Sequence, residues 1–380
     1  MGTPQLKGYL NHVEIRGFRS LKDVSVELSP LTVLIGANGA GKSNFIKFFE
    51  MMRWLMDGRS LREWVLRESG ADDNLFMGKD ITDSVTCRLS LTIEGQQDRY
   101  EYQAKFLADT SDQMSIVYEH TRSSDEKWMM LPSASTDISS VFYQGIRKPI
   151  LADGKLLKSG IPQVLGYFLQ RCRVYQFHDT ARNAAIKNRH DTSDSVFLNS
   201  DGGNLAAVLL SLQENQPKRF KLIEKQISRV LSSFDGFVLE PQYGKVMLRW
   251  RHKQGDKIMG AHLTSDGSLR LFCLITLLNL PVEQLPDIIL LDEPELGLHP
   301  NAITLIAAMI QRVSHTSQVI LATQSPFMVD CFELDNIVVA DLEEGATRLR
   351  KLAKETYQQW LDDEFSVSEL WLSNVLGGQP

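Results

Sequence analysis

The stretch Gly36-Ala37-Asn38-Gly39-Ala40-Gly41-Lys42-Ser43 has the spacing G-x-x-x-x-G-K-[ST] of a phosphate-binding P-loop. It follows the apolar run 31–35, which predicts a buried strand, and it precedes apolar residues at helical spacing from Phe45 to Met56. Glycines let consecutive backbone N–H groups point into one cavity, and the positive end of the following helix faces that cavity. The strand, the complete motif and the helix together argue against a chance match.

The chemistry of the motif assigns roles to its polar residues. We expect Lys42 to reach the β- and γ-phosphates of a nucleotide and the Ser43 hydroxyl to complete the shell of a Mg²⁺ ion. The predicted nucleotide-binding residues of this stretch are Asn38, Gly39, Gly41, Lys42, Ser43 and Asn44.

The composition is that of an ordinary soluble globular protein. The chain has 380 residues, of which 43% are hydrophobic and 23% charged, and its net charge of −6 provides no general basic field for nucleic acid. A DNA contact would therefore need a local basic patch. Four widely separated cysteines without a C-x-x-C pair suit a reducing compartment. Because no signal pattern and no membrane-spanning run is present, we expect a cytoplasmic protein without a membrane partner.

Several alternating runs predict β-structure around the P-loop. Runs 12–19 and 24–28 predict two strands ahead of it, and runs 85–93 and 100–106 predict an antiparallel meander, which we interpret as an inserted β-lobe. The segment 121–160 reveals no chemistry. A basic stretch follows, and it is either a solvated loop or a phosphate-contacting surface. Its basic residues are Arg182, Lys187, Arg189 and His190.

The second half of the chain adds polar groups at the ends of predicted elements. Ser265 and Gly267 open an apolar helix, which predicts a second anion site. The apolar run 288–291 ends in Asp292 and Glu293, and the carboxyl ends of buried parallel strands are where such sheets place ligand groups. We expect Asp292 to hold Mg²⁺ through its water shell and Glu293 to act as the general base for the attacking water.

Two further polar residues are more ambiguous. Gln324 follows the apolar run 318–322, where its amide is either a contact to the γ-phosphate or the attacking water, or an ordinary strand end. His299 stands in the turn after Glu293 and is either a dimer contact or a turn histidine bonded locally.

Taken in order, these motifs resemble the ABC-type ATPases of the RecF/OLD/SMC branch, and most closely the short OLD-like "AAA family ATPases" of bacterial defence operons. The resemblance rests on the motifs Ile15–Leu21, Gly36–Ser43, Ser265–Gly267, Leu291–Pro300 and Thr323–Pro326. It implies an α/β P-loop ATPase head with a mixed or parallel central sheet, an antiparallel β-lobe and a helical lobe. It also implies a head-to-tail homodimer, or a higher oligomer, with ATP and Mg²⁺ between the subunits.

In that dimer each site would combine Lys42, Ser43, Asp292 and Glu293 of one chain with Ser265 and Gly267 of the other. Within the family pattern, Gln176 stands where a glutamine loop contacts metal and water, and His299 falls in a loop that crosses the dimer interface.

The sequence departs from the family pattern in two places. Gln324 replaces the histidine of many relatives, and a glutamine makes the same hydrogen bond without titrating. No acidic D-x-D constellation follows Glu293, so we expect the Toprim nuclease domain of full-length OLD proteins to be missing and any nuclease to be a separate polypeptide.

The predicted organisation has five parts. They are residues 1–80 with the P-loop, 81–170 with the β-lobe and a variable segment, 171–262 with the glutamine loop and a helical and hairpin lobe, 263–345 with the signature, Walker B and switch motifs, and a tail from 346 to 380.

The expected function is an ATP-hydrolysing dimer switch that controls an effector such as a nuclease or toxin, in defence against phage or foreign DNA. One alternative is a RecF-like repair ATPase that binds DNA directly. Another is the ATPase subunit of a transporter, against which the β-lobe and the absence of a membrane span argue. A scaffold that binds ATP without hydrolysing it is disfavoured by Glu293.

Overall fold

The computed structural model describes residues 7–124, 126–131, 136–139, 141, 151–152, 155–156, 160–255 and 257–379. The predicted variable segment 121–160 lies partly outside these residues. The chain forms two compact units, which we describe separately. Unit 1 comprises Met1–Val174, Pro286–Leu290 and Ser317–Pro380, and unit 2 comprises Tyr175–Leu285 and Leu291–Thr316.

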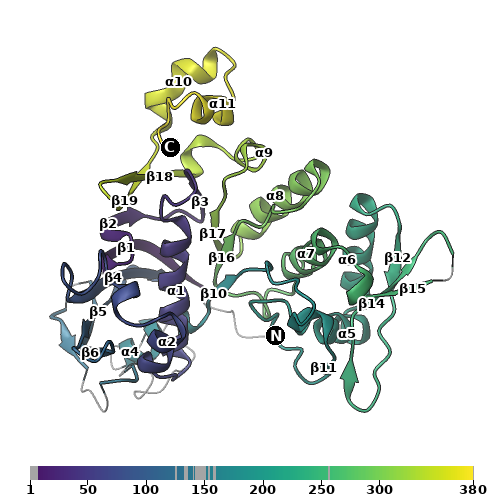
Figure 1. The fold of residues 1–380 in the computed structure, drawn as a ribbon, viewed down its shortest axis with the longest axis horizontal. Helices are drawn as coiled ribbons and strands as arrows, with labels where there is room; N and C mark the ends of the chain where they lie inside the picture. The colour runs from purple at the N-terminus through teal and green to yellow at the C-terminus, as the bar shows by residue number, and fades with distance from the viewer. Residues whose placement is uncertain are drawn as a thin grey trace. The chain divides into compact units, whose positions relative to one another are not determined.

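Unit 1 contains an antiparallel sheet with the strand order β2-β1-β4-β5-β6-β7 (Figure 1). Its strands are β1 (Gly8–Phe18), β2 (Leu21–Glu27), β4 (Ser84–Ile93), β5 (Arg99–Ala108), β6 (Met114–Ser123) and β7 (Met129–Met130). Alternation along β4 buries Val85, Cys87, Leu89 and Leu91 on one face. The meander predicted from the sequence is therefore present, and it continues the sheet that β1 and β2 begin.

The second sheet is mixed and carries the P-loop. Its order is β10-β16-β17-β3-β18-β19, where β3 is parallel to β17 and β18, and β19 is antiparallel to β18. The strands are β10 (Cys172–Tyr175), β16 (Ile288–Asp292), β17 (Gln318–Ala322), β3 (Leu31–Ile35), β18 (Ile337–Glu343) and β19 (Ala346–Lys351). Every residue of β3, β16 and β17 is buried, as expected for the central strands of a sheet with both faces covered.

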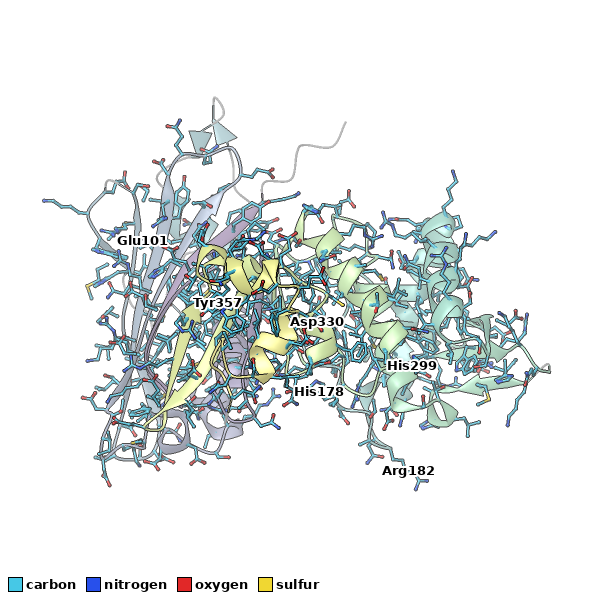
Figure 2. The ribbon with its side chains drawn as sticks, turned by 90° about the horizontal axis from the view of Figure 1, so that it is seen from above. Glu101, His178, Arg182, His299, Asp330 and Tyr357 are labelled. Atoms are coloured by element: carbon cyan, nitrogen blue, oxygen red, sulfur yellow. The ribbon has the colours of Figure 1, made fainter. Side chains whose placement is uncertain are left out.

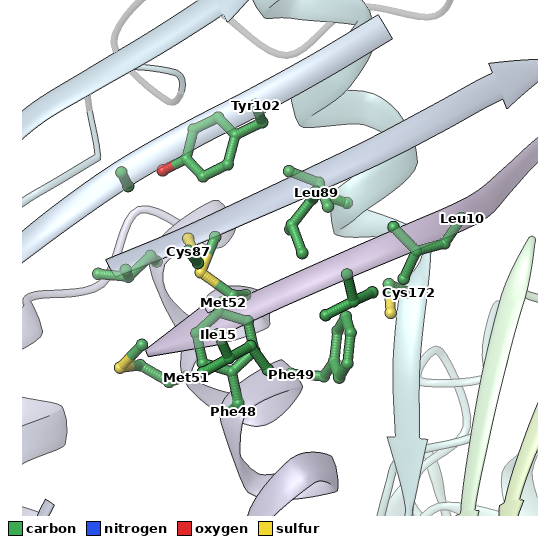
Figure 3. Packing of buried hydrophobic residues seen from close by; sticks show 14 of the residues in the cluster. Leu10, Ile15, Phe48, Phe49, Met51, Met52, Cys87, Leu89, Tyr102 and Cys172 are labelled. Atoms are coloured by element: carbon green, nitrogen blue, oxygen red, sulfur yellow. The ribbon is translucent and has the colours of Figure 1, made fainter. Parts of the chain in front are cut away.

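A hydrophobic core of unit 1 forms where helix α1 (Lys42–Met56) packs on the antiparallel sheet (Figure 3). Phe48, Phe49 and Met52 of α1 meet side chains of β1 and β4, among them Ile15 and Leu89. The apolar residues of α1 recur at helical spacing, so one face of the helix is continuously buried. This packing fixes the helix that begins at the P-loop.

The remaining elements of unit 1 surround these sheets. They are α2 (Leu61–Arg67), η1 (Asp72–Asn74), β8 (Leu151–Ala152), β9 (Lys155–Leu156), α4 (Ile161–Gln170), α9 (Pro326–Val329), η5 (Leu334–Asn336), α10 (Lys354–Asp362) and α11 (Val367–Leu372).

Unit 2 combines helices with a small antiparallel sheet of order β12-β14-β15. An aromatic cluster of Phe234, Phe237, Trp250 and Phe272 joins this sheet to helix α7. Its elements are η3 (Ala185–Lys187), β11 (His190–Asp191), α5 (Leu205–Asn215), α6 (Pro217–Val230), β12 (Phe234–Phe237), β13 (Lys245–Val246), β14 (Arg249–His252), β15 (Ile258–Gly260), η4 (Ala261–Leu263), α7 (Asp266–Leu277) and α8 (Pro300–Ser314). Within the described parts of both units, the helices are too short or too polar to span a bilayer.

A single buried glutamine joins the two sheets of unit 1. The Gln318 side chain accepts from the Leu10 N–H at 2.8 Å and donates to the Leu10 carbonyl at 2.8 Å and the Ser29 carbonyl at 3.0 Å. Gln318 is the first residue of β17 and is only 1% exposed. Its amide therefore satisfies backbone groups of the antiparallel sheet from a strand of the mixed sheet.

Replacing Gln318 with Ala should leave the Leu10 N–H and two carbonyl oxygens without these partners. Because an unsatisfied buried polar group costs about 1–3 kcal/mol, we expect the free energy of unfolding to fall by about 3 kcal/mol in urea unfolding. The exposed Gln359→Ala on α10 is the matched control and should change stability by less than about 0.5 kcal/mol. Equal stability of the two variants would contradict this structural role.

Candidate nucleotide site

The P-loop of unit 1 leads from the buried strand β3 into helix α1. Gly41, the residue before α1, has a φ of 95°, and a Cβ built there would lie 1.9 Å from the Thr347 hydroxyl oxygen. Both the backbone conformation and the close approach therefore require glycine. Asn38 and Gly39 lie exposed at the tip of the loop, and no atom lies within 4 Å of a Cβ built at Gly39.

Lys42 reaches back across the loop. Its side chain is 5% exposed, and Nζ donates to the carbonyl oxygens of Gly36 at 2.7 Å and Ala37 at 3.0 Å. Ser43 follows in the first turn of α1 and is exposed. The loop thus encloses an ammonium group at the N-terminus of a 15-residue helix, which is an arrangement that attracts anions.

The loop is held from outside by groups that the motif does not contain. Thr347 on β19 donates its hydroxyl to the Ala40 carbonyl at 3.0 Å and lies 2.7 Å from the Ser20 hydroxyl. Asn44 donates its amide to the same Ser20 hydroxyl at 2.8 Å. The Asn44 side chain therefore supports the loop, and its direct contact with a nucleotide stays a prediction.

In unit 2 the structure brings together two residues that the sequence separates by 116 positions. The Gln176 side-chain amide donates to the Asp292 carboxylate at 3.1 Å. Asp292 is the last residue of β16 and is 6% exposed. Nε2 of His178 lies 2.9 Å from the Asp292 carbonyl oxygen, so this nitrogen carries the proton. No sequence motif singles out His178, which Figure 2 labels.

Glu293 has a φ of 44°, which is an uncommon conformation for a residue with a side chain. Its side chain is half-buried. Such backbone geometry is maintained only where the surroundings hold it, and it often accompanies functional sites. This position agrees with the predicted role of Glu293 as general base, which remains a prediction.

Ser265 caps helix α7 and accepts from the Ser268 N–H at 3.3 Å, while its side chain remains exposed. Gly267 lies in the first turn of α7, where the chain approaches the Gly297 carbonyl closely. These two residues therefore lie at the capped N-terminus of α7 in unit 2, and the second anion site there stays a prediction.

Arg270 of α7 ties the signature helix to the glutamine loop and to the turn after Glu293. Its guanidinium donates to the carbonyl oxygens of Phe177 at 3.0 Å, His178 at 3.3 Å and Leu296 at 2.7 Å. Two backbone segments of unit 2, at residues 177–178 and at Leu296, thus share one cation. The sequence offered no basis for selecting Arg270, because its partners are backbone atoms.

The two ambiguous residues have distinct positions. His299 is exposed and caps α8, because its Nδ1 accepts from the Asn301 N–H at 3.3 Å (Figure 2). This is the locally bonded turn histidine that the sequence allowed as one of two interpretations. Gln324 is half-buried between β17 and α9. The P-loop and Gln324 belong to unit 1, whereas Gln176, Ser265, Gly267, Asp292, Glu293 and His299 belong to unit 2.

The basic stretch is mostly engaged within unit 2. Lys187 is 9% exposed, donates to the Thr180 carbonyl at 2.5 Å and lies 3.9 Å from the Asp266 carboxylate. Nε2 of His190 lies 2.9 Å from the Ala185 carbonyl oxygen. Arg182 and Arg189 are exposed, and Figure 2 shows Arg182 pointing outward. The interpretation of all four residues as a phosphate-contacting surface is therefore wrong for Lys187, whose ammonium is buried and already bonded.

Comparison with known proteins places this site in a family. The family model described as "AAA domain, putative AbiEii toxin, Type IV TA system" matches residues 31–330. A second family model, described as "Protein of unknown function (DUF2813)", matches residues 8–53. The chain belongs to the first family.

Curated relatives include Old and RecF proteins, which belong to the branch that the motifs indicated. The Old nuclease of Escherichia phage P2 is 24% identical over 92% of this chain, which spans 62% of that protein's length. The RecF protein of Acholeplasma laidlawii is 22% identical over 62% of each chain.

Two solved structures share the fold. The first is an Smc head bound to the C-winged helix domain of ScpA, with a TM-score of 0.59 at 15% identity, covering 92% of this chain and 99% of that chain. The second is an Smc head with an extended coiled coil, bound to the C-terminal domain of ScpA derived from Pyrococcus furiosus. Its TM-score is 0.56 at 14% identity, and the match covers 94% of this chain and 99% of that chain. The predictions of an ABC-type ATPase of the RecF/OLD/SMC branch and of its fold are confirmed.

Replacing Thr347 with Val should keep the shape of β19 and remove the hydroxyl that holds Ala40 and Ser20. Because a hydrogen bond contributes about 1 kcal/mol, we expect ATP affinity, measured by titration calorimetry, to fall about five- to tenfold. Thr86→Val on β4 is the matched control and should leave the affinity unchanged. An unaltered affinity in Thr347→Val would show that the loop does not need this support.

Proposed function

We propose that this protein binds ATP with Mg²⁺, hydrolyses it, and uses the cycle to join and release two copies of the chain and thereby control an effector. The single observation that carries the proposal is the P-loop of unit 1. The loop already has the conformation, the buried ammonium of Lys42 and the helix N-terminus that a triphosphate requires.

The residues present suit a magnesium nucleotide. Ser43 and Asp292 are the oxygen donors that would hold Mg²⁺, with Gln176 bonded to Asp292 and positioned to orient it. Among the described residues no group of three His, Cys, Asp or Glu side chains could form a metal site without a nucleotide. Mg²⁺ usually binds through few protein ligands and substrate phosphates, and when bound it neutralises phosphate charge.

The proposed roles of the remaining residues follow from their positions. Glu293 would accept a proton from the attacking water, and Gln324 would donate its amide to the γ-phosphate or orient the water. Both proposed roles of Gln324 are independent of pH, because an amide does not titrate and donates a hydrogen bond at any physiological pH.

Features of unit 2 support a head-to-tail dimer. Ser265 and Gly267 lie at the N-terminus of α7, and the Ser265 side chain is exposed there. An exposed hydroxyl at a helix N-terminus can contact an anion that is bound to another chain. Two apolar side chains next to these motifs are exposed as well, Leu263 at 62% and Leu296 at 42%. Apolar side chains beside a polar ligand site are typical of a surface that another protein covers.

An effector and a role in defence are supported by names rather than by geometry. The family description includes a putative toxin, and one relative is a nuclease from a phage. The RecF-like alternative, direct DNA binding, has less support from the structure. Lys187 of the basic stretch is buried, and only Arg182 and Arg189 remain exposed there.

Replacing Glu293 with Gln should trap ATP, because the amide keeps the shape of the side chain and cannot accept a proton from water. We expect light scattering to show a doubling of molar mass for this variant only with ATP and Mg²⁺, together with a loss of phosphate release of at least a hundredfold.

Lys42→Ala is the matched control for this experiment. It should stay at the mass of the nucleotide-free protein under every condition, since it lacks the ammonium that holds the phosphates. If Glu293→Gln binds ATP and its mass does not change, the nucleotide-driven dimer is wrong. If neither wild type nor variant binds ATP, the proposed function itself fails.

A further inference from the structure

The segment 366–378 folds back from the end of unit 1 toward the nucleotide site. Helix α11 begins at Val367 with a complete capping box, in which the Ser366 hydroxyl accepts from the Glu369 N–H and the Glu369 carboxylate accepts from the Ser366 N–H. Figure 1 shows α9, α10 and α11 together next to β18. This segment makes contacts at two places that matter for a bound nucleotide.

The first contact is with the short helix that follows Gln324. Asp330, the residue after α9, accepts from the Ser368 N–H at 2.8 Å and from the Ser368 hydroxyl at 2.6 Å. Helix α9 is itself capped by Ser325, directly after Gln324. Only one short helix therefore separates α11 from the predicted γ-phosphate sensor.

The second contact is with the first glycine of the P-loop. Gly378 has a φ of 78°, and its N–H donates to the Asp341 carboxylate of β18 at 2.6 Å. A Cβ built at Gly378 would lie 2.7 Å from Val339 and 3.4 Å from the Cα of Gly36. Gly36 also lies close to β18, because a Cβ built at Gly36 would lie 2.3 Å from the Ala340 carbonyl oxygen. Gly36 thus lies between β18 and the returning segment.

Trp371 connects the two contacts. It stands on α11, is 3% exposed, and its Nε1 lies 3.2 Å from a Cβ built at Gly378. Within the described part of the chain its N–H has no hydrogen-bond partner. An unsatisfied buried donor is destabilising, so a shift that offered it a carbonyl oxygen would be favoured. Arg350 of β19 also fixes this end, because its guanidinium donates to the Leu376 carbonyl at 2.5 Å.

We propose that Ser368, Trp371 and Gly378 are positioning residues that couple the γ-phosphate sensor at Gln324 to the P-loop at Gly36. The inference rests on the proposed nucleotide site. It adds that the preference for ATP over ADP depends on the returning segment. A nucleotide with a γ-phosphate engages both Gln324 and the P-loop, and the segment links these two groups, whereas ADP engages the P-loop alone.

The test is Gly378→Ala, in which the new methyl group meets Val339 and detaches the segment. The ratio of ADP to ATP dissociation constants should fall about tenfold, because ATP affinity falls more than ADP affinity. Gly244→Ala is the matched control, because Gly244 has a φ of 73° and nothing lies within 4 Å of its built Cβ. It imposes the same backbone strain and should leave the ratio as in wild type. Ser368→Ala should shift the ratio in the same direction.

A loss of ATP and ADP affinity by the same factor in Gly378→Ala would overturn the coupling and leave only a structural role. Amide hydrogen exchange of the nucleotide-free protein gives a second readout that needs no nucleotide binding. We expect Gly378→Ala to speed exchange both in residues 36–41 and in α9. Faster exchange confined to residues 366–378 would also overturn the inference. A protein that binds no ATP in wild-type form would instead contradict the proposed function, and exchange would still decide the coupling.

Discussion

The structure depends on one constraint, which is that the P-loop backbone must curve around the ammonium group of Lys42. Two carbonyl oxygens of the loop accept hydrogen bonds from Nζ, so the loop surrounds a positive charge and shields it from water. A buried ammonium is costly unless hydrogen bonds satisfy it, and a phosphate would add the charge that the carbonyl groups lack. The hydrogen bonds to Gly36 and Ala37 hold the ammonium group inside the loop, at the helix N-terminus that attracts anions.

Keeping the loop in this state requires support from segments far away in the sequence. Ser20 follows β1, Thr347 belongs to β19, and Gly378 lies near the end of the described chain, yet all three touch the P-loop or the residues beside it. The mixed sheet brings Thr347 to the loop, because β3 lies next to β18 and β18 next to β19, while Ser20 contacts Thr347 and Gly378 contacts Asp341 of β18. The order of strands, rather than the motif, decides which residues hold the loop.

The sequence predicted the parts of this molecule whose signals are local. The mostly apolar, β-branched run 31–35 became β3, and the motif and the acids at the end of β16 identified the family that the comparisons confirm. Thr347, Arg270 and Gly378 could not be found in this way, because they act on backbone atoms of distant segments and have ordinary neighbours. For the basic stretch the sequence left two interpretations open, and only the fold reveals that Lys187 contacts Thr180 and Asp266.

The arrangement inside unit 2 bears on how two nucleotide sites could communicate. Arg270 bonds the signature helix to the carbonyl oxygens of Phe177, His178 and Leu296, and His178 in turn bonds the Asp292 carbonyl. Helix α7, which begins after Ser265, is therefore joined to the Asp292 backbone through Arg270 and His178. In a head-to-tail dimer these residues would serve different nucleotides, so a shift of Asp292 at one site would be transmitted to the signature at the other. Coupling of this kind would need only two side chains, those of Arg270 and His178, within a single subunit.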